Sequence, residues 1–378
     1  VKADRKTAVD WYRRAYEKHN YTDISLNRIG SFYRDGENYP EALEWWRRGE
    51  SKNYPTCTAN LGWAYRYGKD VNADWQQADG YFKRAIELGE TDGFSEMNLG
   101  DIYWTGGSGV DADRKTAVDW YKRACEKNNS SDDSLNRIGK FYSNSGKYSE
   151  ALEWWRRGES KNYPACIGNL GWAYYHGKGV DIDWQQAVNF FNRAIEFGHD
   201  AGIAEMNLGD IYWTGGNGVK ADRKTAVEFY KRAHEKNNFT DESINRIAHF
   251  YINDGNNQNY PEALKWWRLG EEKNFCMCTA NLGWAYYSGN GVEVNWQQAV
   301  IYFERAIAFG ETDGYSEMSL GEIYYAGGNG IFPNYEKAAR YFAKALAKGR
   351  KFSDDEMAKL AESEYQCGDG YYLGKNNF

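Results

Sequence analysis

A stretch of 21 residues occurs three times in this chain and limits what the chain can fold into. It reads MNLGDIYWTGGSGVDADRKTA over Met97–Ala117, and close copies occupy residues 206–226 and 318–338. Leu99 and Tyr103 are four positions apart, so they share one face of a helix. The glycines that follow allow a tight reversal, and a later aspartate is placed to cap the next helix. The stretch therefore predicts the bend of a helical hairpin.

Tryptophans reveal a longer period. Trp45, Trp154 and Trp266 are equivalent, with spacings of 109 and then 112 residues. This period predicts three near-identical modules, each of three hairpins, whose short helices are stable only when stacked on their neighbours. The first helix of most hairpins carries a leucine or isoleucine followed by a glycine, and we expect this glycine to lie where two helices cross closely. In the third hairpins these glycines are Gly100, Gly209 and Gly321. The predicted modules and the terminal hairpin helix after them span residues 3–111, 112–220, 221–332 and 333–350.

The repeated pattern resembles the Sel1-like repeat, a relative of the tetratricopeptide repeat. Its fullest form is carried by Leu170, Gly171, Tyr174, Gly177, Gly179, Val180, Asp183, Ala187, Phe190, Phe191, Ala194 and Gly198. The resemblance implies an all-α fold, an α-solenoid superhelix of about nine to ten hairpins, and a bacterial member of the family. We expect the solenoid over residues 1–352 and a C-terminal capping helix and tail over 353–378, with the tail starting at Gly368.

Composition disfavours several functional classes. The net charge of -7 and the pI near 5.5 argue against a nucleic-acid partner. No apolar run reaches the roughly 18 to 20 residues that span a bilayer, so we predict a soluble protein without a transmembrane segment. Residues 1–9 are identical to residues 219–227, in the middle of a hairpin, so we expect a mature form or a piece of a longer array. The compartment stays open between bacterial periplasm and cytoplasm.

The reactive side chains give no catalytic or metal-binding pattern. Cys57, Cys166 and Cys278 are equivalent residues one module apart, which predicts small buried core residues rather than a disulfide framework. The five histidines occupy non-equivalent places without useful partners. The glycine turns lack the Lys-Ser or Lys-Thr of a phosphate-binding loop. We therefore predict no enzyme activity, no metal and no cofactor.

A partner-binding face is implied by the resemblance. In tetratricopeptide-like hairpins the first helix lines the concave face, and residues around the leucine-glycine pair point into it. Asparagine amides and aromatic rings there suit an extended peptide or a protein loop. An asparagine before leucine could instead only tie one helix to the next, and the aromatics could be groove or core. The predicted residues are Asn60, Trp63, Asn98, Asp101, Trp104, Asn169, Trp172, Tyr175, Asn207, Asp210, Trp213, Asn281, Trp284 and Tyr287.

The function that follows is a non-enzymatic interaction scaffold that binds another protein or peptide on its concave face. We expect Trp172 and Trp213, near the middle of the array, to anchor the partner, and Trp184, on the convex side, to matter much less. Two alternatives remain. Sel1-like relatives in bacteria include immunity proteins that neutralise a secreted effector such as a lipase, and proteins that bind host proteins. The chain could also be a spacer or oligomerisation region of a longer protein whose catalytic part is missing.

Overall fold

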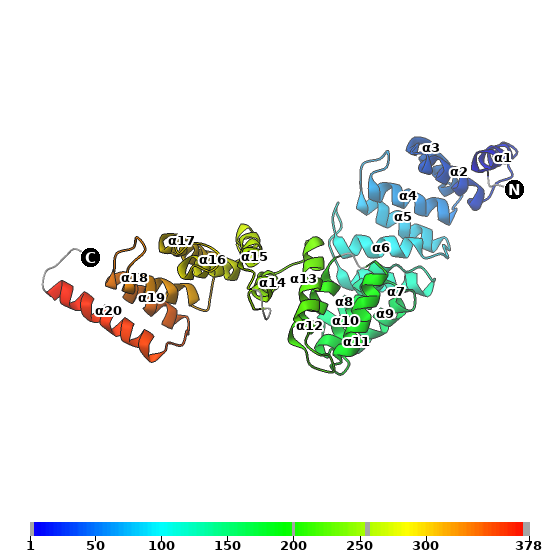
Figure 1. Cartoon of the computed structure of the whole chain (residues 1–378). Helices are drawn as coiled ribbons and strands as arrows, with labels where there is room; N and C mark the ends of the chain where they lie inside the picture. Colours follow the sequence, from blue (N-terminus) through cyan, green and yellow to red (C-terminus); the bar gives the residue numbers. More distant parts are fainter. Residues whose placement is uncertain (1–3, 199–200, 254–257, 373–378) are drawn as a thin grey trace. The chain divides into compact units, whose positions relative to one another are not determined.

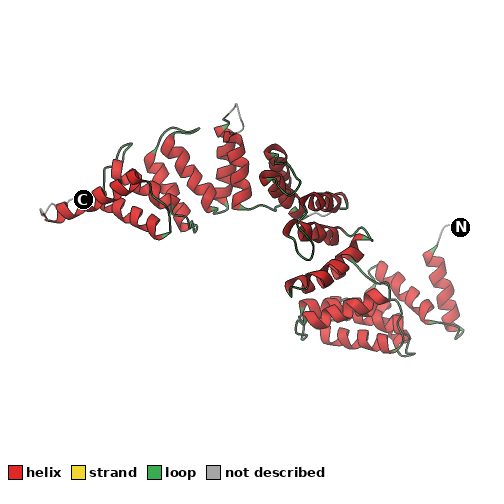
Figure 2. Cartoon of the chain, turned by 90° about the horizontal axis from the view of Figure 1, so that it is seen from below, coloured by secondary structure: helices red, strands yellow, loops and turns green. Residues whose placement is uncertain are grey.

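The computed structural model describes residues 4–198, 201–253 and 258–372. Within these ranges the chain forms twenty α-helices and no strand, as predicted (Figure 2). The contacts between residues divide the chain into two compact units, Val1–His199 and Asp200–Phe378. In each unit, consecutive helices pack as antiparallel pairs joined by short turns (Figure 1).

Helix bounds follow the hairpins expected from the repeat. The first unit contains α1 (Arg5–Glu17), α2 (Asp23–Asp35), α3 (Tyr39–Glu50), α4 (Pro55–Tyr67), α5 (Trp75–Glu87), α6 (Phe94–Thr105), α7 (Arg114–Glu126), α8 (Asp132–Asn144), α9 (Tyr148–Glu159), α10 (Pro164–His176) and α11 (Trp184–Glu196). The second unit contains α12 (Ile203–Thr214), α13 (Arg223–Glu235), α14 (Asp241–Asn253), α15 (Tyr260–Glu272), α16 (Cys276–Ser288), α17 (Trp296–Ala308), α18 (Tyr315–Ala326), α19 (Tyr335–Ala347) and α20 (Asp354–Tyr372).

The founding stretch folds as its residues predict. The side chain of Asp113 accepts hydrogen bonds from the backbone N–H groups of Lys115 and Thr116 at 3.0 and 3.1 Å, and so caps α7. Between the helices, Gly106 has a φ of +66°, which favours glycine, and a Cβ there would meet the backbone nitrogen of Ala112 at 2.7 Å. The turn therefore needs glycine both for its backbone angle and for its space.

Eight hairpins are closed by a glycine on their first helix and a large ring on their second, and in the α14–α15 hairpin Ala248 stands in place of the glycine. A Cβ on these glycines would meet the ring at 2.1 to 3.0 Å, which is too close for any side chain. The rings are nearly or fully buried, so they fill the seam between the helices. The predicted close crossings at Gly100, Gly209 and Gly321 are confirmed. The pairs are Gly30–Trp46, Gly62–Phe82, Gly100–Tyr121, Gly139–Trp155, Gly171–Phe191, Gly209–Tyr230, Gly283–Phe303 and Gly321–Phe342.

The equivalent cysteines occupy a second kind of seam. Cys57, Cys166 and Cys278 are fully buried, as predicted. The Sγ of Cys57 would lie 2.3 Å from a Cβ built on Gly49, so the thiol of one hairpin lies against a glycine of the previous one. Burial raises the pKa of all three thiols, which keeps them protonated. They therefore pack as small apolar groups.

The C-terminal boundary corrects one expectation. A helix was expected to begin at Ser353, and the Ser353 hydroxyl does accept a hydrogen bond from the N–H of Glu356 at 3.3 Å. The tail was expected to start at Gly368, but α20 continues through it to Tyr372. A single glycine costs a helix only about 1 kcal/mol, so it need not end one. Residues 373–378 lie outside the described ranges.

Candidate functional site

Three of the predicted asparagines tie first helices of consecutive hairpins together. The Nδ2 of Asn60 on α4 donates to the Oδ1 of Asn27 on α2 at 2.9 Å, and to the carbonyl of Thr56 at 2.9 Å. Asn60 is 7% exposed. The alternative of a helix-to-helix tie therefore describes these amides better than a peptide-binding ladder. The equivalent pairs are Asn169–Asn136 at 2.6 Å and Asn281–Asn245 at 2.9 Å.

The asparagines of the third hairpins are also engaged. Asn98 donates to the Phe94 carbonyl at 2.8 Å, and its Oδ1 accepts from the Nη1 of Arg66 at 2.6 Å. Asn207, which is half-buried, donates to the Ile203 carbonyl at 2.8 Å. Each amide thus donates a hydrogen bond to a carbonyl of its own helix.

The predicted aromatics of the second hairpins lie against the hydrophobic core. Trp63 and Trp284 meet the buried rings of Trp46 and Trp267 edge-on, with centroids 6.3 and 6.5 Å apart. Trp172 is half-buried and packs on the core cluster that contains Trp155. These tryptophans therefore fill seams with part of their surface, which leaves only their outer edges for a partner.

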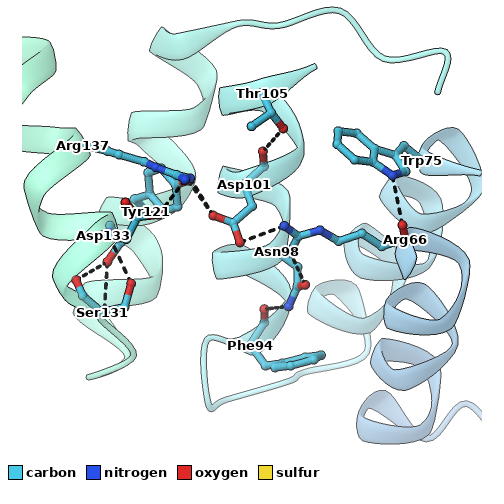
Figure 3. Close-up of polar contacts among 11 residues, drawn as sticks. Arg66, Trp75, Phe94, Asn98, Asp101, Thr105, Tyr121, Ser131, Asp133 and Arg137 are labelled. Atoms are coloured by element: carbon cyan, nitrogen blue, oxygen red, sulfur yellow. Dashed lines mark hydrogen bonds and ion pairs between the residues drawn. The ribbon is translucent and has the colours of Figure 1, made fainter. Parts of the chain in front are cut away.

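A tryptophan contact that we did not predict closes the second hairpins. The indole N–H of Trp75 donates to the carbonyl of Arg66, in the last turn of α4, at 3.0 Å (Figure 3). Trp184 and Trp296 repeat this with Tyr175 and Tyr287 at 3.2 and 3.1 Å. Each bond satisfies a carbonyl in the last turn of a helix, where such groups lack helical partners. Trp184 therefore has a structural role in its hairpin; its smaller weight in partner binding stays a prediction.

Asp101 is the centre of a polar cluster in the first unit (Figure 3). Its carboxylate accepts from the hydroxyl of Tyr121 at 2.8 Å and forms ion pairs with Arg66 at 3.0 Å and Arg137 at 2.9 Å. The ring of Trp104 lies beside this cluster, 5.5 Å from the guanidinium of Arg137. The cluster thereby links four helices, α4, α6, α7 and α8.

Asp210 occupies the same place in the second unit. It accepts from the hydroxyl of Tyr230 at 2.8 Å and from Arg246 at 2.7 Å. Burial raises the pKa of Asp210, although the Tyr230 hydrogen bond and the Arg246 charge act in the opposite direction. Burial, followed by the Asp210 charge, raises the pKa of Tyr230 and keeps its hydroxyl protonated. Tyr230 therefore remains a hydrogen-bond donor.

A pocket of about 410 Å³ adjoins this cluster, between α12, α13 and α14. One predicted residue, Trp213, lines it. The ring of Trp213 has one guanidinium on Arg223 at 5.3 Å from its centroid and a second on Arg246 at 5.6 Å. Such cation–π contacts hold an aromatic ring in place. The lining residues are Trp213, Arg223, His249, Phe250 and Asn253.

Sequence reasoning missed most of this pocket. Of the five lining residues, the prediction from the sequence included Trp213 and none of Arg223, His249, Phe250 and Asn253. Burial lowers the pKa of His249, which favours the neutral imidazole. A usable signal was the arginine that begins three of these second helices, at Arg5, Arg114 and Arg223, each followed by a helix that ends in a polar residue.

The described ranges add two further facts about the site. Within residues 4–198, 201–253 and 258–372, no three histidine, cysteine or acidic side chains are grouped to hold a metal ion. In the same ranges every helix is too short or too polar to cross a bilayer.

Family models agree with the repeated hairpins. The Sel1 repeat matches residues 1–20, 24–54, 94–129, 164–199, 202–238, 242–275, 277–308 and 314–349. A tetratricopeptide repeat matches residues 56–96. The chain belongs to the Sel1 repeat family. Sel1 and tetratricopeptide repeats are commonly protein-interaction scaffolds.

Solved structures show the same fold for this Sel1 repeat protein. One is a protective antigen present in uropathogenic Escherichia coli strains, which displays an SLR fold. It is 24% identical with a TM-score of 0.65, over 96% of this chain and 87% of that one. Another is a Sel1 repeat protein from Oxalobacter formigenes, 23% identical with a TM-score of 0.59, over 83% of this chain and 89% of that one.

Proposed function

We propose that this protein is a non-enzymatic scaffold that binds a segment of a partner protein, and that the pocket beside Trp213 is a main contact. The observation that carries the proposal is the pocket itself. It combines the rings of Trp213 and Phe250 with the guanidinium of Arg223. Tryptophan and arginine are the residue types enriched where a few contacts carry most of the binding energy.

The pocket is also held in its shape before any partner arrives. Arg246 lies over the Trp213 ring while its own charge is paired with Asp210 at 2.7 Å and with Glu242. The ring centroid of Trp213 is 6.4 Å from that of Tyr230, which is buried against Gly209. A side chain fixed in this way loses little entropy on binding, which favours affinity.

The test uses the full chain and a display library of random linear peptides. Peptides that bind the parent chain are resynthesised, and their affinity is measured for Trp213→Ala. We expect at least tenfold weaker binding, because losing a central aromatic contact costs about 1.4 kcal/mol or more. Trp11→Ala is the matched control: Trp11 is 62% exposed but does not line a described pocket, so binding should be unchanged.

Arg223→Ala is a second variant, since truncating Trp213 also removes packing against Tyr230. Helicity and thermal midpoint should stay close to those of the parent in this variant. If the library yields no peptide whose affinity depends on Trp213 or Arg223, the pocket is not a binding site and the proposal fails.

A further inference from the structure

An arginine begins the second helix of three third hairpins. Arg5, Arg114 and Arg223 are the first residues of α1, α7 and α13, at intervals of 109 residues. In the first module, Arg5 forms an ion pair with Asp35, the last residue of α2, at 3.0 Å. The equivalent residues in the next two modules are Asn144 and Asn253.

This exchange of aspartate for asparagine changes the charge beside the arginine. An amide has no charge with which to neutralise a guanidinium. Within the ranges that the structure describes, neither Arg114 nor Arg223 forms an ion pair or a side-chain hydrogen bond. Each instead lies over a tryptophan ring, Trp104 or Trp213, at 5.3 Å. Their N–H groups, five on each guanidinium, are thus available to a ligand.

The pocket around Arg223 also differs in charge from its counterpart in the first module. That counterpart, of about 520 Å³ between α1 and α2, includes the carboxylates of Asp4 and Asp35 in its lining. Among the described residues, those that line the pocket of the second unit include no carboxylate, but they include Asn253, whose amide can donate a hydrogen bond. An anionic group would therefore meet the donors of Arg223 and Asn253 in this pocket.

We propose that Arg223 and Asn253 form a receptor for an acidic side chain of the partner segment. The carboxylate takes the place beside Arg223 that Asp35 takes beside Arg5. A planar guanidinium suits a carboxylate because it can donate two parallel hydrogen bonds. Trp213 and Phe250 beside it favour an aliphatic or aromatic residue next to the acid. This inference rests on the binding proposed at the Trp213 pocket, and it specifies the partner: an acidic residue flanked by an apolar one.

In the first unit the residues equivalent to Arg223 and Asn253 are Arg114 and Asn144, and Arg114 lies over the ring of Trp104. There the residue equivalent to His249 is Lys140, which is exposed. A lysine adds a positive charge that a neutral imidazole lacks, so an acidic segment should be attracted more strongly to this copy. We therefore expect a second site of the same chemistry around Arg114.

The experiment introduces a carboxylate beside Arg223 by the substitution Asn253→Asp, so that the chain itself occupies the proposed site. It uses Arg114→Gln as the background, so that only the second unit responds. Peptides selected on this chain are resynthesised with acetylated and amidated ends, so that side chains hold their only carboxylates. We expect Asp or Glu beside an apolar residue, and at least tenfold weaker binding to Asn253→Asp, which supplies an internal partner for Arg223. Changing the peptide's acid to its amide should have a similar effect.

Two controls keep the outcomes separate. Asn144→Asp makes the same change in the first unit, where Arg114→Gln has already removed the guanidinium, and should leave the affinity unchanged. Arg223→Gln tests the same contact without introducing a charge into α14 and should also weaken binding. Peptides that need Trp213 but tolerate Asn253→Asp, Arg223→Gln and loss of their own acid would overturn the carboxylate receptor and leave the scaffold proposal standing. Peptides that are indifferent to Trp213 as well would overturn both.

Discussion

The same seam occurs in both units, and its two copies differ in charge pairing. Helices α6 and α12 share the sequence MNLGDIYWT, yet Asp101 pairs with two arginines and Asp210 with one. The extra arginine, Arg66, comes from α4, and the residue equivalent to it one module later is Tyr175. A copied helix therefore does not carry its electrostatics with it, because part of its charge environment comes from neighbouring hairpins.

Packing at this seam is alike in the two copies, while polar contacts are not. The rings of Tyr121 and Tyr230 both lie 2.5 Å from where a glycine Cβ would stand. The ion pairs differ, since Asp101 meets Arg66 and Arg137 and Asp210 meets Arg246. Burial raises the pKa of Asp210, and the charge of Arg246 acts in the opposite direction. Mutations should therefore have equal effects in the two copies where they disturb packing, and unequal effects where they disturb charge.

The largest effect is expected from Gly100→Leu and Gly209→Leu. Each inserts a side chain into a ring contact that has no room for even a Cβ, so the free energy of unfolding should fall by roughly 3 kcal/mol, at the upper end for overpacking. The two variants should be alike when followed by urea unfolding. Gly80→Leu on α5 is the control, because nothing lies within 4 Å of its Cβ position. A clear difference between the first two would show that the seams are not equivalent.

The next effect should separate the copies. Asp101→Ala removes the acceptor that Arg66, Arg137 and the Tyr121 hydroxyl share, and we expect a loss of about 2 kcal/mol. Asp210→Ala removes one arginine contact fewer and should cost about 1 kcal/mol. Hydrogen exchange of the helices on each side of the seam would report the difference locally.

The control for these aspartates is Asp119→Ala, an exposed position on α7. It should change hydrogen exchange little. Equal losses for Asp101→Ala and Asp210→Ala would mean that Arg66 contributes nothing to the first seam.

Repetition explains why the helices could be predicted from the sequence. The leucine-glycine pair, the glycine turn and the capping aspartate each specify a local conformation, and three copies of the pattern agree on the same boundaries. Gly209 facing a ring and Cys166 in the core follow directly, because a repeat must bury the same face each time. The end of α20 escaped prediction, since it has no second copy and Gly368 gave a misleading signal.

The candidate site was predicted less well, for a physical reason. Repeats show which residues recur but not which group each side chain reaches. Asn60 recurs because it bonds Asn27 on a neighbouring hairpin, and Trp184 because its N–H bonds a backbone carbonyl. Arg223 and Asn253 stand thirty residues apart, and only folding brings them to one pocket. The sequence does mark one of these positions, because the three modules differ there: Asp35 is replaced by Asn144 and Asn253.

Proton binding should also differ between the units. Burial, with Asp92 nearby, raises the pKa of Glu90 to about 8, and burial with Asp313 raises that of Glu311 to about 7. The usual pKa of a glutamate is 4.5, so below pH 4.5 these carboxyls are protonated in the folded and in the unfolded chain. As pH rises from 4.5 towards 8, the unfolded chain releases its proton first, and the folded state loses stability. Glu90→Gln should then stabilise the chain at pH 8 by about 1 kcal/mol or more, and much less at pH 5.

Thermal unfolding at the two pH values measures this effect. Glu311→Gln should give the same sign and a smaller gain, since the pKa of Glu311 is raised less. A stabilisation that is the same at pH 5 and pH 8 would assign the effect to packing rather than to the proton.

The smallest effect concerns the exposed arginine pairs. Asn253→Asp gives Arg223 a carboxylate in the geometry that Arg5 and Asp35 already use, and Asp35→Asn removes that pair. Arg5 is 77% exposed and Asp35 42%, so solvent screens the attraction strongly. Each change should therefore alter the free energy of unfolding by about 0.5 kcal/mol or less, with opposite signs. Thermal midpoints at low and high salt measure this change, and the difference should vanish at high salt.

An Asn253→Asp variant that keeps its stability but loses peptide binding would separate the pocket's binding role from its contribution to the fold. If Asn253→Asp instead destabilises the chain strongly, Asn253 holds α14 in place and the copies differ for structural reasons.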